Sequence, residues 1–390
     1  MYQIKTMNKI SKTGLSRLNA DKFVLSDDCA EPQGILVRSA SLHDCAFSSR
    51  LLAIARAGAG TNNIPVDACA AQGIVVFNTP GANANAVKEL VMAALLLASR
   101  DIIGGAAWVK EQAATPGVDV AAVVEKGKAA FAGPEIYKKS LGVVGLGAIG
   151  ALVCNTAHEL GMDVYGYDPY LSVETALRLD RHVHVVSNID ELYKVADYIT
   201  LHIPYMPSTK DFINAEALAK MKDGVRVLNL ARGELVNNAD MAAALESGKV
   251  ARYVTDFPNA EVAAMKNVVA LPHLGASTPE SEENCAVMAV DELRDYLLYG
   301  NIKNSVNMPN ASLEPSGIAR ICLIHKNVPS MLTQIMTTLS DDGINVENMT
   351  NKSRKDYAYT LVDVNTRITP EVEQELAEIE NMIRVRVLQA

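Results

Sequence analysis

The stretch that most constrains the fold is SLGVVGLGAIGALVCNTAHELGMDVYGYDPY at residues 140–170. Three of its glycines, Gly145, Gly147 and Gly150, follow an apolar run and open a helical pattern. In such a strand–turn–helix unit the first glycine permits a tight turn, the second lets the backbone approach a pyrophosphate, and the third lets helix and strand pack closely. Free N–H groups at the start of the helix then bind the phosphates. The spacing predicts a doubly wound α/β domain that binds a dinucleotide.

Asp168 closes the next predicted strand, about twenty residues after the glycines. A carboxylate at this place hydrogen-bonds the ribose hydroxyls and repels a 2′-phosphate. Neither of the next two residues, Pro169 and Tyr170, is basic. The pattern therefore favours NAD over NADP, the alternative being a glycine turn that binds nothing.

Apolar runs separated by helical stretches predict two parallel sheets. In the first ninety residues the predicted strands lie within 34–39, 51–60 and 73–80. After residue 140 they lie at 141–145, 164–168, 198–203, 225–230, 251–256 and 268–271, the size of a complete nucleotide-binding domain. Residues 88–110 have the pattern of one long buried helix that joins two domains.

The end of the chain is predicted to form a separate unit. A stretch rich in Asn, Ser and Pro, 301–317, is typical of a linker. Beyond it the predicted order is βαββαβ: strand 318–324, helix 329–340, strands 344–349 and 357–364, helix 370–379 and strand 383–388.

Composition excludes several classes of protein. The 390 residues carry a formal net charge of −9, which argues against a nucleic-acid or anionic-membrane partner. The six cysteines are scattered without a C-x-x-C pair, as in reduced cytosolic proteins. The N-terminus lacks the apolar core of a signal peptide, and the apolar run 90–98 is too short to span a bilayer. A soluble, cytoplasmic protein is expected.

Two polar residues follow strands of the predicted nucleotide-binding sheet. Arg232 comes just after one strand, and its guanidinium group can hold a carboxylate with two hydrogen bonds. His273 follows another, and its imidazole can accept a hydroxyl proton or polarise a keto oxygen. Open α/β sheets bind ligands at this edge, so we expect both in an active site. The alternatives are a surface arginine paired with Glu234 and a structural histidine.

Two carboxylates compete for the role of partner to His273. Glu261 and Asp256 both follow the strand between Arg232 and His273. A carboxylate on the far ring nitrogen orients an imidazole and raises its pKa. An acidic group at the strand tip can instead approach the nicotinamide end of the cofactor. The sequence alone favours Glu261 as the partner and leaves both roles open.

The motifs VVGLGAIG, YGYDP, LHIP, LNLARGELV and LPHLGAST resemble, in this order, those of the D-isomer-specific 2-hydroxyacid dehydrogenases. The resemblance covers essentially the whole chain. It implies NAD-dependent oxidation of a 2-hydroxy acid in a cleft between two α/β domains, with Arg232, Glu261 and His273 as the catalytic residues. Members that oxidise 3-phosphoglycerate, in the first step of serine synthesis, are the most similar. Glycerate, lactate or 2-hydroxyglutarate remain alternative substrate types, and a non-catalytic NAD-sensing regulator is a third possibility.

The resemblance also implies domain bounds and binding residues. The discontinuous substrate-binding domain is expected at 1–97 and 283–308, the NAD-binding domain at 98–282, a linker at 309–316, and an ACT regulatory domain at 317–390. The remaining cofactor contacts are expected at Ala148, Ile149, Ile203, Pro204, Ala231, Gly275 and Ala276, with Asp256 near the nicotinamide. Substrate contacts are expected at Arg38, Ser39, Arg56, Gly58, Ala59 and Gly60, the arginines being candidates for the substrate phosphate. No metal is expected.

The ACT domain is expected to bind an amino acid at a subunit interface. The motif HKNVPSML resembles that of serine-sensing members, so His325 and Asn327 are expected to contact L-serine, with Asn345 reaching it from the neighbouring subunit. Ser330 stands where members commonly carry glycine, a departure that affects the predicted pocket. A homodimer or homotetramer is expected. The alternative is an ACT domain that only joins subunits.

Overall fold

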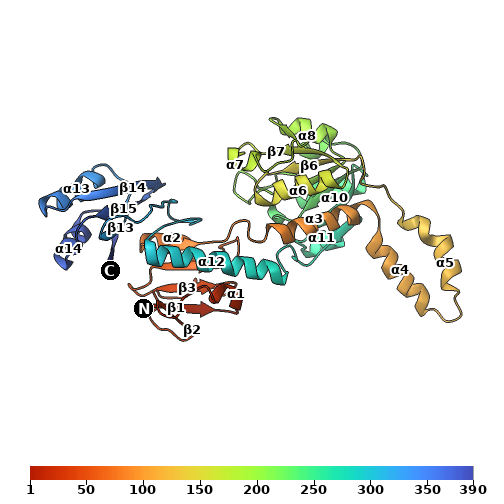
Figure 1. Cartoon of the computed structure of the whole chain (residues 1–390). Helices are drawn as coiled ribbons and strands as arrows, with labels where there is room; N and C mark the ends of the chain where they lie inside the picture. Colours follow the sequence, from red (N-terminus) through yellow and green to blue (C-terminus); the bar gives the residue numbers. More distant parts are fainter. Residues whose placement is uncertain (390) are drawn as a thin grey trace. The chain divides into compact units, whose positions relative to one another are not determined.

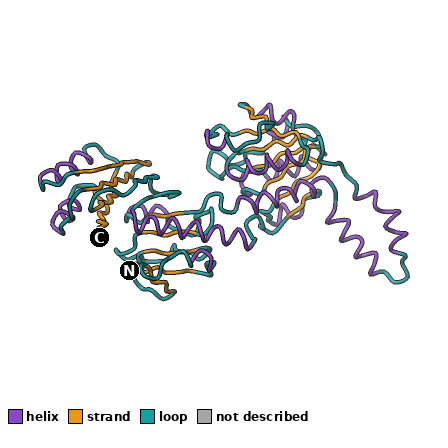
Figure 2. Tube along the Cα trace, viewed as in Figure 1, coloured by secondary structure: helices purple, strands orange, loops and turns teal. Residues whose placement is uncertain are grey.

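The computed structural model describes residues 1–389. They form two compact units, Met1–Asn83 with Pro279–Ala390 and Ala84–Thr278 (Figures 1 and 2). The predicted fold class is confirmed, since two parallel sheets covered by helices are followed by a four-stranded antiparallel sheet with two helices in an ACT-like arrangement.

The second unit contains a seven-stranded parallel sheet in the order β12-β11-β10-β9-β6-β7-β8. Its strands are β6 (Ser140–Val144), β7 (Asp163–Tyr167), β8 (His184–Val186), β9 (Tyr198–Leu201), β10 (Val225–Asn229), β11 (Val250–Thr255) and β12 (Val268–Ala270). The connecting helices are α6 (Ala148–Glu159), α7 (Val173–Ala176), α8 (Ile189–Val195), α9 (Ala215–Lys220), η2 (Gly233–Leu235), α10 (Asn238–Glu246) and α11 (Ala260–Ala264).

The predicted single helix at 88–110 is wrong. The structure has two helices there, α3 (Ala84–Ser99) and α4 (Ile102–Ala114). Asp101 caps α4, because its Oδ1 accepts a hydrogen bond from the Gly104 N–H at 3.2 Å, and a capping residue begins a new helix. α3 contributes to the core, whereas α4 has no buried residue and projects from the unit with α5 (Val120–Gly127) and η1 (Lys128–Phe131) (Figure 1).

The first unit contains a five-stranded parallel sheet in the order β2-β1-β3-β4-β5. Its strands are β1 (Tyr2–Met7), β2 (Phe23–Ser26), β3 (Gly34–Val37), β4 (Ala53–Arg56) and β5 (Val75–Phe77). The helices α1 (Lys12–Leu15), α2 (Val66–Ala71) and α12 (Pro279–Tyr299) complete this part.

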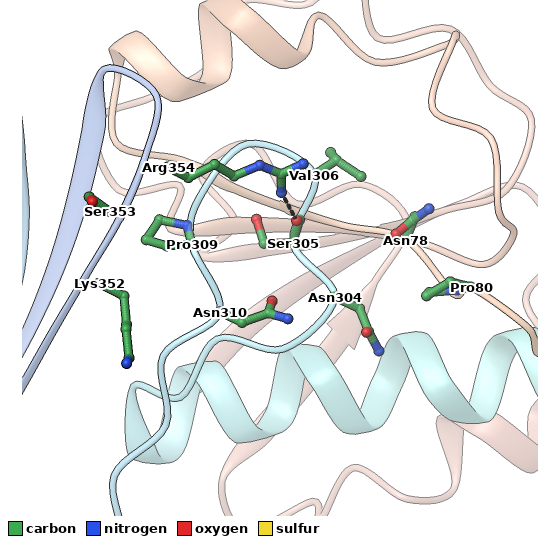
Figure 3. A pocket seen from close by; sticks show the side chains of 10 residues that line it. All are labelled: Asn78, Pro80, Asn304, Ser305, Val306, Pro309, Asn310, Lys352, Ser353 and Arg354. Atoms are coloured by element: carbon green, nitrogen blue, oxygen red, sulfur yellow. Dashed lines mark hydrogen bonds between the residues drawn. The ribbon is translucent and has the colours of Figure 1, made fainter. Parts of the chain in front are cut away.

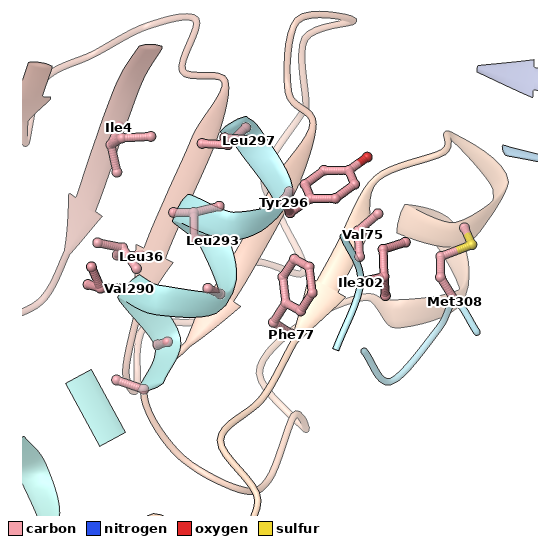
Figure 4. Packing of buried hydrophobic residues seen from close by; sticks show 14 of the residues in the cluster. Ile4, Leu36, Val75, Phe77, Val290, Leu293, Tyr296, Leu297, Ile302 and Met308 are labelled. Carbon is pink, nitrogen blue, oxygen red and sulfur yellow. The ribbon is translucent and has the colours of Figure 1, made fainter. Parts of the chain in front are cut away.

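Helix α12 supplies much of the core of the first unit. Val290, Leu293 and Leu297 recur at helical spacing along one face and pack in the cluster that holds Ile4 and Leu36 of the sheet (Figure 4). Each buried aliphatic side chain contributes about 1.5–3 kcal/mol relative to exposure. This face fixes a distant segment of the chain on the N-terminal sheet.

Residues 302–311 are a fixed loop, although the sequence pattern here suggested a linker. Ile302 and Ala311 pair through two backbone hydrogen bonds of 2.8 and 3.0 Å. The Asn307 side chain accepts from the Val76 N–H at 2.9 Å and donates to the Ile74 carbonyl at 2.8 Å, in the manner of an added strand partner for β5. The polar residues that resemble a linker therefore hold the loop against the sheet.

The antiparallel sheet of the first unit has the order β14-β15-β13-β16. Its elements are β13 (Ala319–Lys326), α13 (Met331–Asp341), β14 (Val346–Arg354), β15 (Tyr357–Val364), α14 (Pro370–Glu378) and β16 (Met382–Gln389), which is the predicted βαββαβ order. A bidentate ion pair between the buried Arg320 and Asp363 joins β13 to β15, with N–O distances of 2.6 and 2.7 Å.

Within residues 1–389, no single helix is long and apolar enough to cross a membrane; α3 and α4 together, bent by 65° at their break, meet the criterion by length and composition only.

Candidate active site

The carboxyl ends of six parallel strands lie in one row across the second unit. The last residues of these strands are in register from strand to strand: Tyr167, Val144, Leu201, Asn229, Thr255 and Ala270. Each residue that follows such an end therefore lies at the same edge of the sheet. This edge is where open α/β sheets bind ligands.

The glycine turn after β6 has the geometry expected of a pyrophosphate site. Gly145 has a φ of +91°, and a Cβ atom at Gly150 would lie 1.9 Å from the Gly145 carbonyl oxygen. A Cβ at Gly147, by contrast, would meet nothing within 4 Å. Gly147 is also the N-cap of α6 and offers no side-chain hydrogen bond to the first turn. The start of this helix is thus open on the side from which phosphates are bound.

Asp168 follows β7 and is fixed by two backbone N–H groups. Its Oδ2 accepts from Leu146 at 2.9 Å and its Oδ1 from Tyr170 at 2.8 Å. The first bond ties the carboxylate directly to the glycine turn. Each oxygen keeps a further lone pair, which is the acceptor that a ribose hydroxyl requires.

The other predicted cofactor residues lie at the same edge. They follow β9 (Ile203 and Pro204), β10 (Ala231) and β12 (Gly275 and Ala276), while Ala148 and Ile149 begin α6. His202 also follows β9, and burial lowers the pKa of its imidazole to about 4. His202 therefore stays neutral at ordinary pH and is a weak base compared with an exposed imidazole.

Arg232 is presented by a loop that Asn229 shapes. The buried Asn229 amide donates to the Arg232 carbonyl at 2.8 Å, and its Oδ1 accepts from the N–H groups of Ala231 and Arg232 at 3.2 and 3.3 Å. The Arg232 side chain is exposed, and its Nη1 donates to the Ala231 carbonyl at 2.6 Å. Asn229 was not predicted from the sequence, although its place at the end of a buried strand was a usable signal.

His273 and Arg232 contact the same aromatic ring, that of Phe257. The Phe257 ring centroid is 4.5 Å from that of His273 and 5.7 Å from the Arg232 guanidinium carbon. His273 also has a φ of +32°, a conformation that costs a non-glycine residue about 1–3 kcal/mol. Backbone bonds from its N–H to the carbonyls of Asp256 and Leu271, both 3.1 Å, hold this conformation. The Phe257 ring therefore contacts two exposed polar side chains, Arg232 and His273, at the carboxyl edge of the sheet.

The two candidate carboxylates have different surroundings. Glu261, on α11, is exposed and accepts from the Asn238 amide at 3.1 Å. Within residues 1–389 no hydrogen bond or ion pair joins Glu261 to His273, so its orienting role stays a prediction. Asp256 is 1% exposed, and its Oδ1 has no hydrogen-bond partner. Burial raises the pKa of Asp256, against the attraction of His273 and Arg232, which lowers it.

The predicted substrate residues lie in the first unit, after β3 and β4. Arg38 forms an ion pair with Glu282 at 2.8 Å, and the Arg56 Nε donates to the Arg38 carbonyl at 3.1 Å. The Ser39 N–H, expected to face a carboxylate, donates instead to the Asn8 side chain at 3.1 Å. Gly58 has a φ of +155°, which favours glycine.

Two further predicted substrate residues, Ala59 and Gly60, follow Gly58 in the loop after β4. The Ala59 carbonyl accepts a hydrogen bond from the Asn78 amide at 2.5 Å. Their contact with a substrate stays a prediction.

The residues expected to bind an effector are already engaged within the ACT-like domain. His325 is 2% exposed, with its Nε2 2.9 Å from Thr360 Oγ1 and its Nδ1 2.8 Å from the Lys326 carbonyl. The amides of Asn327 and Asn345 donate to the Lys355 carbonyl at 3.0 Å and to Glu347 Oε1 at 3.2 Å. A contact between these side chains and serine stays a prediction.

Comparison with known proteins agrees with this geometry. Residues 92–275 match the family described as D-isomer specific 2-hydroxyacid dehydrogenase, NAD binding domain. A D-3-phosphoglycerate dehydrogenase of Haemophilus influenzae is 32% identical over 354 residues, which cover 87% of this chain and 82% of that protein. The chain belongs to the D-isomer specific 2-hydroxyacid dehydrogenase family.

Other relatives extend or limit this result. The enzyme of the same name from Synechocystis is 36% identical over 307 residues, but the chain spans about half of its length, 52%. A crystal structure of a glyoxylate reductase from Paecilomyes thermophila has a TM-score of 0.63 at 25% identity and covers 78% of this chain and 98% of its own. A cofactor-bound 3-phosphoglycerate dehydrogenase of Entamoeba histolytica, at 24% identity and a TM-score of 0.58, supports the fold alone.

The residues of the second unit fit the NAD that this family's domain binds. The open space at Gly147 accommodates a pyrophosphate, and the tethered Asp168 carboxylate offers acceptors to a ribose. The unpaired, buried Oδ1 of Asp256 lies one residue after β11, at the same edge. A buried acceptor without a donor is costly, so an amide group of a bound ligand would stabilise it.

Proposed function

We propose that the chain is an NAD-dependent dehydrogenase that oxidises 3-phospho-D-glycerate at its 2-hydroxyl to 3-phosphohydroxypyruvate. The observation that carries the proposal is the pair of exposed groups, Arg232 and His273, which both contact the ring of Phe257 at the edge that also holds the glycine turn. The substrate is proposed because relatives at 32% and 36% identity are named D-3-phosphoglycerate dehydrogenase.

Each of the two groups has a defined task in this proposal. The Arg232 guanidinium binds the substrate carboxylate and fixes the orientation of the neighbouring carbon. An imidazole nitrogen of His273 accepts the hydroxyl proton, and the imidazolium returns it to the keto oxygen in the reverse direction. Bound NAD supplies the acceptor for the hydride that leaves the substrate carbon.

The carboxylate that supports His273 is the open part of the mechanism. We assign the orienting role to Glu261, which accepts a hydrogen bond from Asn238 through Oε2 and has its second carboxylate oxygen to offer to the imidazole. Asp256 stays beneath the loop, where its burial favours a neutral carboxyl until His273 becomes positively charged. Replacing Glu261 by Gln would then lower kcat by removing the charge that stabilises the imidazolium, whereas an unchanged kcat contradicts this role.

The ACT-like domain is proposed to sense L-serine in a homodimer or homotetramer. Its alternative role is to join subunits without binding an effector. Saturating L-serine should lower the rate and raise the thermal midpoint of the full chain, because a ligand that binds the folded state stabilises it. No effect on either quantity would leave only the joining role.

The test of the main proposal is NADH formation with a panel of D-2-hydroxy acids. We expect the phosphorylated glycerate to exceed glycerate, lactate and 2-hydroxyglutarate in kcat/KM. His273→Ala should lower kcat by at least about a hundredfold. His182→Ala is the matched control, an exposed imidazole on the same unit but outside this edge.

Two outcomes would overturn parts of the proposal. Equal rates for glycerate and its phosphorylated form would remove the substrate assignment and keep the chemistry. NAD binding without turnover of any member of the panel would refute the enzyme and favour a regulator.

A further inference from the structure

A pocket of about 480 Å³ lies in the first unit between β14 and the fixed loop 302–311 (Figure 3). Three separate segments form its walls: Asn78 and Pro80 after β5, residues 304–310 of the loop, and Lys352–Arg354 at the end of β14. Its volume is in the range of small-molecule sites. Neither the catalytic edge nor the residues expected to bind serine contribute to it.

The pocket is positively charged in a chain with a net charge of −9. Lys352 and Arg354 line it, and no lining residue is acidic. Within residues 1–389, the ammonium group of Lys352 has no hydrogen bond or ion pair, so its charge is uncompensated in the folded chain. The other polar lining residues, Asn78, Asn304 and Asn310 among them, are neutral. Such a lining favours an anion over a cation or an apolar ligand.

The carboxyl group bonded to the lining residue Asn304 does not neutralise this charge. Glu292 on α12 accepts from the Asn304 amide at 2.7 Å, and burial raises the pKa of Glu292 to about 8. At neutral pH it is therefore mostly protonated. Asn304 lies between this carboxyl group and the pocket, so the positive charges of Lys352 and Arg354 are not neutralised by it.

The walls are fixed before any ligand binds. Arg354 Nη1 donates to the Ser305 carbonyl at 2.6 Å and ties β14 to the loop, as Figure 3 shows. The Ser305 hydroxyl donates to the Val76 carbonyl at 3.0 Å and ties the loop to β5. In the same view Asn310 lies between Lys352 and Asn304. Walls held by these bonds reduce the ordering cost of binding.

We propose that this pocket binds a small oxyanion, a phosphorylated or carboxylated metabolite, through Lys352, Arg354 and the amide of Asn310. The ammonium group of Lys352 and the donors of Arg354 not used by Ser305 form charge-assisted hydrogen bonds with the anion. The site also contacts Asn78 and Pro80, just before the chain passes into the second unit at residue 84. The proposal does not depend on the proposed dehydrogenase activity.

The test is direct binding to the full chain by calorimetry at constant ionic strength, with inorganic phosphate and succinate as separate probes. The tighter probe distinguishes a phosphate from a carboxylate ligand. Lys352→Gln should weaken binding about tenfold, the loss expected for one charge-assisted hydrogen bond. Lys355→Gln is the matched control: it removes the same charge from the next turn, outside the pocket.

The thermal midpoint separates loss of the site from loss of folding, since Lys352→Gln should weaken binding and keep the midpoint of the parent. A second pocket variant, Arg354→Gln, removes the other cation and should also weaken binding; because it also removes the bond to Ser305, its midpoint is measured alongside. Binding of either probe that is lost in both pocket variants and kept in Lys355→Gln supports the site. No saturable binding, or equal affinity in the parent and Lys352→Gln, overturns it, since phosphate held at a dinucleotide or substrate site would not respond to Lys352.

Discussion

The buried carboxyl of Glu292 makes the stability of the first unit depend on pH. The side chain is 8% exposed, its Oε1 accepts from Asn304, and its Oε2 has no partner. Burial raises the pKa of Glu292 from its ordinary 4.5 to about 8 in the folded chain. The folded state therefore binds a proton that the unfolded state has lost, and stability falls as pH rises from the unfolded pKa through the folded pKa.

The magnitude follows from this difference in pKa. One pKa unit corresponds to about 1.4 kcal/mol. As pH rises from about 5 to about 8, the free energy of unfolding therefore falls by about 3–4 kcal/mol, because the unfolded state loses the proton that Glu292 keeps in the folded state. In Glu292→Gln this loss is absent, because the amide keeps the carbonyl acceptor for Asn304 and carries no titrating proton. The NH₂ group in the place of Oε2 adds a cost that does not depend on pH.

The assay is urea unfolding of the parent and Glu292→Gln over this pH range, followed by far-UV circular dichroism. Tryptophan fluorescence is unsuitable, because Trp108 is the single tryptophan and lies in the second unit. The stability of the variant relative to the parent should rise by about 3–4 kcal/mol towards the higher pH. Glu283→Gln, an exposed change on the same helix, should leave the profile unchanged. Parallel profiles for Glu292→Gln and the parent would refute the reasoning.

Four further substitutions test other parts of the structure. Gly150→Ala places a Cβ 1.9 Å from a carbonyl oxygen of the turn, so it should lower both thermal stability and NADH affinity, whereas Gly147→Ala, with free space around its Cβ, should lower affinity alone; fluorescence titration and thermal melts distinguish them. Ser330→Gly should stabilise the chain by about 0.5–1 kcal/mol in urea, because Ser330 has a φ of +67°, and a lower midpoint would contradict this. Asp363→Ala should cost about 3–5 kcal/mol in the same assay by leaving Arg320 buried without its partner, and a loss below about 1 kcal/mol would show that the pair is not needed.

Buried strands could be predicted from the sequence, and marginal ones could not. The six predicted strands of the second unit agree with β6, β7, β9, β10, β11 and β12 within about two residues, because continuous apolar runs identify strands covered on both faces. β8 at the sheet edge was missed, since its three residues are at most half-buried and include a histidine. β1 and β2 were also missed, because they are mostly not buried and polar residues interrupt their apolar runs.

Errors in the remaining segments have a common physical origin. The run 88–110 is apolar throughout, but Asp101 can cap a helix as well as sit on its surface, and composition does not distinguish these states. The Asn- and Ser-rich stretch 302–311 has the composition of a linker, yet its amides pair with the backbone of β5. In both cases a polar side chain forms a hydrogen bond with the backbone. Asp101 bonds the first turn of a new helix, and Asn307 bonds residues that are distant in the sequence.

For the candidate site, the sequence predicted which residues lie at the carboxyl edge of the parallel sheet, but not which side chains contact them. Arg232 and His273 could be placed there because parallel strands end on one side of a sheet. Phe257, which contacts both, was not predicted, and Asn229, which shapes the loop of Arg232, was overlooked although its place at the end of a buried strand was a signal. Glu261, expected to be the partner of His273, is bonded to Asn238, a contact that depends on two helices meeting and that no local pattern encodes.

The C-terminal end of α12 explains how the ACT-like sheet is attached to the rest of its unit. A helix end leaves four carbonyl groups without intrahelical donors and carries a partial negative charge. Arg386 of β16 donates to the carbonyls of Tyr296 and Leu297 at 2.7 and 2.8 Å, and Arg320 of β13 donates to that of Tyr299 at 2.7 Å. The Tyr359 hydroxyl of β15 donates to the Gly300 carbonyl at 2.6 Å.

These three strands together cap one helix, and that helix has 21 residues and begins at Pro279, where the chain returns to the first unit. At about 1.5 Å per residue it extends about 30 Å from the capped end to that point. An effector that shifts β13 or β16 must either move α12 with the strand or leave carbonyl groups of its last turn without donors, at a cost of about 1–3 kcal/mol for each buried group. Moving α12 would in turn disturb the packing of Val290, Leu293 and Leu297 in the core of the first unit, so these contacts couple the position of the ACT-like sheet to that core.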